Sequence, residues 1–325
     1  MKDSIIKNIL VNLRAYFTTN FKRRINENSA RITRLEEMVC VLDQRMTTKY
    51  HYLNLLDYYG QHLEEAKSYQ KELNYLQQYG EYCCFPYKTA SILEHVVTGI
   101  DMESHLPYVI HKNKKLFFKA KHTLADVLDL YQNYIQTERL LGNEDTEDIP
   151  HQYQSPRVHV SNGDVVFDIG AAEGLFALDQ IENVSHVVIV ESDPEWIIPL
   201  KQTFAPYSDK VTIIQKFVSA VDTDTTISLE KILSQIEFRS AFIKMDIEGY
   251  ELQSLTAAER TLRKGKGLKL SVASYHKQHD AEEMKSFFDN IGYFSEFSNG
   301  YMLFHLYDTP TPPYFRKGII RAYSL

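Results

Sequence analysis

A run of small residues directly after an apolar segment forms the first candidate ligand site of this chain. Residues 165–174 read VVFDIGAAEG, so that Gly170, Ala172 and Gly174 follow a strand-like stretch with the spacing G-x-A-x-G. Small residues let the backbone approach a ligand closely at the carboxyl end of a strand, where open α/β sheets bind ligands. The dinucleotide pattern G-x-G-x-x-G would place its third glycine on Leu175. The spacing therefore favours a ligand without a pyrophosphate, with a plain strand-to-helix turn as the structural alternative.

The ends of the next two apolar runs extend this candidate site. Val187–Val190 leads into Glu191, 17 positions after Gly174, where a carboxylate can accept hydrogen bonds from both hydroxyls of a ribose. The alternative for Glu191 is a solvated carboxylate at a strand end. Phe217 follows the third run, where it could flank an adenine ring. The candidate cofactor-binding residues are Asp168, Gly170, Ala172, Glu173, Gly174, Glu191, Ser192, Phe217 and Asp246.

Three carboxylates stand within six positions at the end of the fourth apolar run. Residues 242–251 read FIKMDIEGYE and contain Asp246, Glu248 and Glu251. The two glutamates have a structural alternative, because an acidic residue in the first turn of a helix stabilises it by about 0.3–1 kcal/mol. Asp246 is less well explained in that way. We expect its carboxylate to lie beside the sulfonium group of a cofactor or beside the hydroxyl group of an acceptor.

His276 is the candidate general base, because it follows the fifth apolar run on the side of the expected cleft. A positioned base typically contributes about 10²- to 10⁴-fold to a rate. The structural alternative for His276 is a polar residue at the rim of the sheet. The candidate catalytic residues are therefore Asp246, Glu248 and His276. A divalent metal held by Asp246 and Glu248 is the alternative means of activating a hydroxyl.

From residue 156 onward, short apolar runs alternate with helical segments, which is typical of a parallel sheet covered by helices on both faces. The runs 293–297 and 301–307 are separated by Ser298-Asn299-Gly300, and Asn-Gly between β-rich runs predicts a tight hairpin. We therefore expect an α/β fold with a seven-stranded, mostly parallel sheet that ends in an antiparallel hairpin. This layout is typical of Rossmann-like class I methyltransferases rather than of dinucleotide dehydrogenases.

These segments resemble the FkbM family of S-adenosylmethionine-dependent methyltransferases. The resemblance covers about residues 150–325, and its motifs are VVFDIGAAEG (165–174), VIVESD (188–193), FIKMDIEGYE (242–251), SYHKQHD (274–280) and FRKGIIRA (315–322). It implies S-adenosyl-L-methionine as the cofactor and O-methylation of a sugar, a glycan or a related small metabolite. It also implies that Asp168, Gly170, Ala172, Gly174 and Glu191 line the cofactor, and that Asp246, Glu248 and His276 face the acceptor. A Pro-His-x-Tyr element adds His151 and Tyr153 as candidate substrate residues, and Tyr275 joins them.

Ahead of this region the sequence predicts a helical arm over residues 1–80 and a connecting or substrate-cap region over 81–155. The methyltransferase domain is expected over 156–310 and a tail over 311–325. Apolar residues recur every three or four positions from Ile32 to Met46, a short heptad pattern that suits packing or a homo-oligomer. The basic residues near the N-terminus also permit contact with an acidic membrane surface, which we consider less favoured.

The amino-acid composition excludes some of the remaining classes of function and partner. The formal net charge of -7 argues against a nucleic-acid partner, and the chain has no run of about 18 apolar residues that a membrane span requires. Three cysteines and the lack of a signal-peptide pattern at the N-terminus suit a cytoplasmic protein. Two rivals remain: a non-catalytic S-adenosylmethionine-binding protein whose helical arm mediates interactions, and a nicotinamide oxidoreductase.

Overall fold

The computed structural model describes residues 29, 31–35, 38–43, 45–80, 82–88, 96–140, 149–304 and 310–324. The chain divides into two compact units, residues 1–61 and 62–325. In the first unit, the described residues from 31 to 60 are helical, and Ile32, Leu35, Val39, Leu42 and Met46 are each more than half exposed. Among the described residues, no helix combines the length and apolar character that crossing a bilayer demands.

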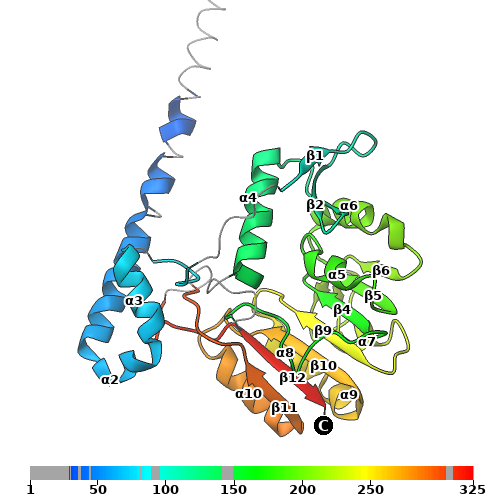
Figure 1. Ribbon diagram of the computed structural model, residues 1–325. Coiled ribbons are helices and arrows are strands. Elements are labelled where there is room, and N and C mark those ends of the chain that lie inside the picture. The colour runs from blue at the N-terminus through cyan, green and yellow to red at the C-terminus, as the bar shows by residue number, and fades with distance from the viewer. Residues whose placement is uncertain are drawn as a thin grey trace, which may run out of the picture. The chain divides into compact units, whose positions relative to one another are not determined.

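A seven-stranded sheet organises the second unit (Figure 1). Its strands are β4 (Val165–Ile169), β5 (His186–Val190), β6 (Val211–Ile214), β9 (Ala241–Met245), β10 (Leu268–Ala273), β11 (Tyr293–Phe297) and β12 (Ile319–Ser324). The spatial order is β11-β12-β10-β9-β4-β5-β6. Six strands run parallel, whereas β12 is antiparallel to both of its neighbours. The expected mostly parallel α/β sheet is thus present, and β4 and β9 lie side by side at its centre.

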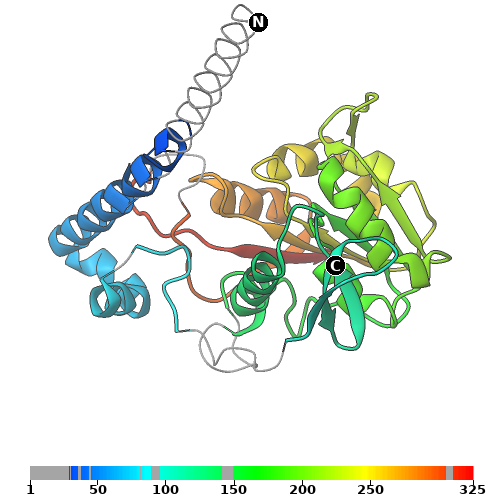
Figure 2. The same ribbon diagram turned by 90° about the horizontal axis from the view of Figure 1, so that it is seen from above.

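Helices cover both faces of this sheet, as a second view shows (Figure 2). They are α4 (Leu124–Ile135), α5 (Leu175–Gln180), α6 (Pro194–Thr203), α7 (Leu229–Leu233), α8 (Glu251–Ala257), α9 (Glu259–Lys264) and α10 (Asp280–Asn290). Alternate residues of β4 enter opposite cores: Val166 packs with residues of α4, α5 and α6, whereas Val165 and Phe167 pack with residues of α7 to α10. All five residues of β4 are buried, as its continuous apolar run predicted.

Smaller elements precede and connect these helices and strands. Helices α2 (Leu63–Ala66) and α3 (Gln70–Tyr79) begin the second unit, with a short 3-10 turn, Lys67–Tyr69, between them. A three-stranded antiparallel sheet follows, made of β1 (Thr98–Ile100), β2 (Pro107–His111) and β3 (Lys114–Phe117). A π-helical turn, Gln136–Leu140, continues α4, a 3-10 turn, Ala205–Tyr207, follows α6, and β7 (Phe217–Val218) pairs with β8 (Thr226–Ile227).

The predicted antiparallel end of the sheet is confirmed only in part. Strand β11 does pair antiparallel with the neighbouring strand, but that strand is β12. Of the predicted run 301–307, residues 305–307 lie outside the described residues, and Met302 forms an isolated bridge with Arg316. The Asn299-Gly300 signal is local, whereas β12 buries Ile319, Ile320 and Ala322 completely between β10 and β11. That burial outweighs the turn preference, because a strand with both faces covered removes far more apolar surface from water. The strand that completes the sheet therefore comes from residues 311–325, which we expected to form a tail.

Candidate functional site

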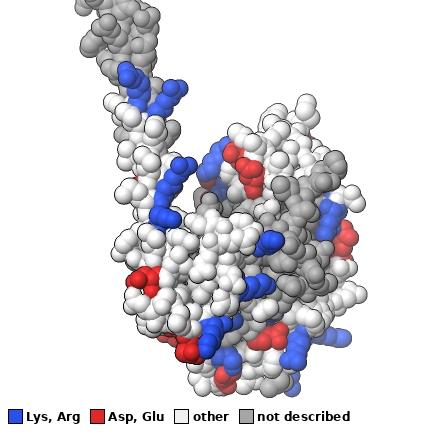
Figure 3. Space-filling view, turned by 60° about the vertical axis from the view of Figure 1, so that its left-hand side comes forward, with Lys and Arg blue, Asp and Glu red and all other residues white. Residues whose placement is uncertain are grey.

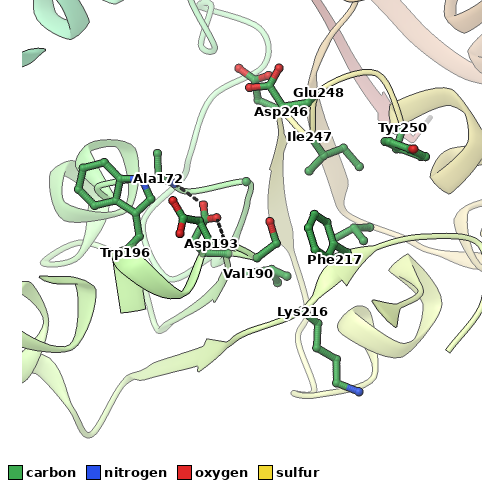
Figure 4. A pocket seen from close by; sticks show the side chains of 14 residues that line it. Ala172, Val190, Asp193, Trp196, Lys216, Phe217, Asp246, Ile247, Glu248 and Tyr250 are labelled. Carbon is green, nitrogen blue, oxygen red and sulfur yellow. Dashed lines mark hydrogen bonds between the residues drawn. The ribbon is translucent and has the colours of Figure 1, made fainter. Parts of the chain in front are cut away.

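A cavity of about 280 Å³ opens at the carboxyl ends of the parallel strands. Of the predicted cofactor residues, it is lined by Gly170, Ala172, Glu191, Ser192, Phe217 and Asp246. Asp246 and Glu248 lie at one end of this cavity and Lys216 at the other (Figure 4). The sequence motifs therefore converge on one concave site, as the strand-end argument predicted.

Gly170 owes its place in this site to a close approach between two strand ends. It has a φ of 75°, and a Cβ atom at this position would lie 1.8 Å from the carbonyl oxygen of Asp246. The Asp246 amide donates to the carbonyl of Ile169 at 3.0 Å, which extends the pairing of β4 with β9 up to the cavity. Any side chain at Gly170 would separate the two strand ends, so a residue without one is required here.

Glu191 is a buried connector rather than a solvated carboxylate. Its side chain is 8% exposed, and its Oε2 accepts a hydrogen bond of 2.8 Å from the amide of Ala172. Its Oε1 accepts another of 2.8 Å from the amide of Asp193, at the start of α6. Glu191 thus fixes the turn after β4 to the turn after β5, and both bonds are drawn in Figure 4.

Three of the predicted cofactor residues do not line the cavity. Asp168 is fully buried beneath it, Glu173 is buried beside it, and Gly174 precedes α5 with a φ of 85°. A Cβ at Gly174 would meet Leu200 at 2.8 Å, so this glycine serves the packing of α5 against α6. Burial raises the pKa of Glu173 to about 7.

Asp246 joins the cavity to a group of aromatic and histidine side chains. The Tyr153 hydroxyl donates to its Oδ2 at 2.7 Å, and the Tyr275 hydroxyl donates to the same oxygen at 3.1 Å. The Nε2 atom of His151 lies 3.5 Å from Oδ2 and 3.2 Å from the Tyr275 hydroxyl. The three predicted substrate residues therefore all contact Asp246. Burial and the charge of Asp246 raise the pKa of both tyrosines well above the usual value.

His276 lies among three carboxylates on the other side of Asp246. Its Nε2 is 3.4 Å from Asp246 and 3.3 Å from Glu248, and its Nδ1 is 3.1 Å from Glu251. Burial opposes the charged form, but hydrogen bonds with Glu248 and Glu251 and the charge of Asp246 raise the pKa of His276 to about 10. This electrostatic setting favours an imidazolium cation, which cannot accept a proton, over the predicted general base.

The cations beside Asp246 keep its carboxylate ionised. Burial alone would raise its pKa, but the hydrogen bond with His151 and the charges of His276 and Lys244 hold that pKa well below the usual value. Donor atoms of Asp246, Glu251 and His276 all lie within 4.8 Å of one another, so these three residues offer a donor set for a metal ion. This set differs from the pair Asp246 and Glu248 that the sequence suggested, because the Glu248 side chain is 65% exposed.

Sequence reasoning missed several residues of the site. Trp196 and Tyr250 line the cavity. Glu251, counted in the carboxylate cluster but not among the candidate site residues, contacts His276 and accepts from the Ile247 amide at 2.7 Å. Lys244, buried on β9, was also missed. A charged residue inside the apolar run Phe242–Met245 was the available signal, since a lysine is rarely buried without a specific partner.

Comparison with known proteins gives one family match. Residues 150–295 match the family model described as the methyltransferase FkbM domain. No curated protein matches the chain.

Among solved structures, the chain is similar to precorrin-6y C5,15-methyltransferase from Geobacter metallireducens, with 15% identity, 52% of this chain and 84% of that one covered, and a TM-score of 0.36. It is also similar to Trm5b from Pyrococcus abyssi, with 14% identity, 71% and 63% covered, and a TM-score of 0.37. A third is precorrin 8W decarboxylase from Methanobacterium thermoautotrophicum, with 14% identity, 55% and 98% covered, and a TM-score of 0.35.

Proposed function

We propose that the protein is an S-adenosylmethionine-dependent O-methyltransferase that acts on a hydroxyl of a sugar, a glycan or a related small metabolite, a proposal supported by the match of residues 150–295 to the methyltransferase FkbM domain. The observation that carries the proposal is the place of Asp246. Its carboxylate lines the cavity and also binds the hydroxyls of Tyr153 and Tyr275. One ionised group thus faces both the expected donor and the expected acceptor.

The cavity residues fit this cofactor. Gly170 allows close contact with the backbone, Glu191 provides carboxylate oxygens for a ribose, and Trp196, Phe217 and Tyr250 provide aromatic surface for an adenine. S-adenosylmethionine would supply a methyl group that is already activated by the positive charge of its sulfonium. The ionised Asp246 suits such a neighbour, since an anion in a buried site stabilises a nearby cation more strongly than it does in water.

The work left to the protein is to align the acceptor and to remove its proton. Alignment of two reactants can supply roughly 7–11 kcal/mol of the barrier. Asp246 and the hydroxyls of Tyr153 and Tyr275 offer hydrogen-bonding groups that would hold a hydroxyl in place. We assign proton removal to His151, since it has one carboxylate within 4 Å whereas His276 has three.

The deciding experiment is a methyl-transfer assay with labelled S-adenosylmethionine on the glycans and metabolites of the source organism, with an Asp246→Asn variant as the matched control. Label found in an acceptor with wild type but not with the variant would support the proposal. Calorimetry with S-adenosylhomocysteine and with NAD separates the rivals. Binding of NAD without S-adenosylhomocysteine would overturn the proposal in favour of an oxidoreductase. Tight S-adenosylhomocysteine binding without transfer to any acceptor would favour a non-catalytic cofactor-binding protein.

A further inference from the structure

Lys244, a charged residue at the centre of the sheet, has no part in the function proposed so far. Lys244 lies on β9, between β4 and β10, and its side chain is 7% exposed. Moving an ammonium group out of water costs several kcal/mol unless partners compensate for it. Its partners therefore indicate what it contributes.

Two partners of Lys244 belong to the end of β4, and its Nζ atom also lies 5.3 Å from the centre of the Tyr153 ring. The ammonium donates to the carbonyl oxygen of Gly170 at 2.5 Å and lies 3.2 Å from Oδ1 of Asp168. Asp168 in turn accepts from the amide of Ala177, in α5, through its other oxygen at 3.2 Å. Lys244 thus connects β9 to the turn that forms one wall of the cavity.

The bond to Gly170 fixes the direction of one peptide group. In a trans peptide the carbonyl and the amide of the following residue point in opposite directions. With the Gly170 carbonyl turned towards Lys244, the Ala171 amide is turned the other way. Gly170 and Ala172, on either side of Ala171, both line the cavity. The buried ammonium therefore holds the Ala171 amide in a fixed direction, between two residues that line the cavity.

Lys244 also belongs to a row of alternating charges across three neighbouring strands. Asp168 follows from β4, Lys244 and Asp246 from β9, and His276 from the end of β10. The charge of Lys244 contributes to the low pKa of Asp246. The same side chain is thus coupled to both the glycine turn and the central carboxylate.

We propose that Lys244 is a positioning residue that holds the Gly170–Ala171 peptide in the orientation that binds the cofactor. This inference rests on the proposed function, because it takes S-adenosylmethionine as the ligand. Lys244 lies beneath the cavity and acts through the peptide, not by contact with the reacting groups.

The test compares two lysine–aspartate pairs in which the aspartate is fully buried, with Lys244 7% exposed and Lys269 16% exposed. Lys244→Met removes the pair below the cavity. Lys269→Met removes an equivalent pair, since Lys269 lies 2.6 Å from the fully buried Asp164, at the other end of the strands. Isothermal calorimetry with S-adenosylhomocysteine gives the dissociation constant of each variant, and thermal unfolding gives its stability. We expect both variants to lose stability, but only Lys244→Met to weaken binding, by about 10-fold or more, as the loss of a hydrogen bond to a charged group implies.

A second pair of variants covers the case in which Lys244→Met does not fold. Asp168→Asn keeps the ammonium and its bond to Gly170, whereas Lys244→Met/Asp168→Asn removes both charges together. We expect near-normal binding for the first and about 10-fold weaker binding for the second. Selective ¹⁵N-alanine labelling adds a readout of the peptide itself, since S-adenosylhomocysteine should shift the Ala171 amide signal in wild type and shift it less in the double variant.

The outcomes separate the two proposals. Equal binding by wild type and by a folded variant that lacks Lys244 would overturn the role of Lys244 and leave the proposed function intact. Weaker binding by Lys269→Met to the same degree would show a general effect of lost stability and would also overturn it. Failure of wild type to bind S-adenosylhomocysteine would reject the proposed function itself.

Discussion

The hydroxyl of Tyr153 donates a hydrogen bond of 2.7 Å to Oδ2 of Asp246, although 93 positions separate the two residues in the chain. Tyr153 precedes the first strand of the large sheet, whereas Asp246 follows the fourth. Their contact joins the segment before the sheet to the cavity, and it places a hydroxyl group at the same carboxylate that is expected to face the cofactor.

Replacement of Asp246 by Asn should lower turnover by about 10²-fold or more, because one preorganised charged group at a reaction centre commonly contributes that much. The measurement is kcat with labelled S-adenosylmethionine. Asp289→Asn is the control, since Asp289 is an exposed partner of Lys285 in α10. Comparable turnover in the two variants would remove Asp246 from the reaction centre.

Replacement of His151 by Ala should lower kcat by about 10²- to 10⁴-fold and leave the affinity for S-adenosylhomocysteine unchanged, as expected for the loss of a general base. The matched variant is His276→Ala, in which kcat should fall less. A larger loss of kcat in His276→Ala than in His151→Ala would make His276 the base, and the assignment to His151 would fail.

The raised pKa of His276 gives a prediction for stability. Its folded-state pKa of about 10 lies above the usual 6.5, so the folded protein holds this proton more tightly than the unfolded chain does. The resulting stabilisation is complete below pH 6.5 and is lost as the pH rises through about 10. Denaturant unfolding should therefore show a decline in stability over this window. His276→Gln should decline less, and identical pH curves for the two proteins would contradict a protonated His276.

Replacement of Glu191 by Gln should weaken S-adenosylhomocysteine binding by about 10-fold or more. The side-chain nitrogen of Gln would face one of the two backbone amides that Glu191 now binds, and it could not accept a hydrogen bond from that amide. Turnover at saturating cofactor should change little. Glu195→Gln is the control, since Glu195 is half exposed and pairs with Lys121. Unaltered cofactor affinity in Glu191→Gln would count against its role in binding.

The donor set of Asp246, Glu251 and His276 allows a direct test of metal dependence. With His276 held as a cation between carboxylates, we expect turnover to survive exhaustive chelation. Activity that is lost on chelation and restored by Mg²⁺ or Mn²⁺ would instead assign hydroxyl activation to a bound metal.

Local motifs predicted the cavity well, because each of its main residues follows a buried strand. Gly170, Glu191 and Asp246 could be placed in that way, since parallel strands bring their carboxyl ends to one edge. The charge state of His276 could not, because it depends on carboxylates whose side-chain directions only the folded turn after β9 sets. In that turn Glu248 has a φ of 58°, and no sequence pattern predicted this left-handed conformation.

The same limit explains why the partner strand of β11 was not the predicted one. Asn299-Gly300 is a strong local turn signal, whereas the choice of β12 as the partner of β11 is made by burial between strands distant in sequence. Gly300 is in fact close to Tyr87 and Pro150, which lie far from it in the chain.

On the face shown in Figure 3, basic and acidic side chains are interspersed.

The internal position of β12 has a consequence for synthesis on the ribosome. Residues 319–324 are made after all other strands of the sheet, yet they occupy a place between β10 and β11. Until they emerge, β10 presents an unpaired edge and β11 has no partner in the sheet. Such an edge can pair with other chains, so the nascent protein passes through a stage at which chaperones would be of use.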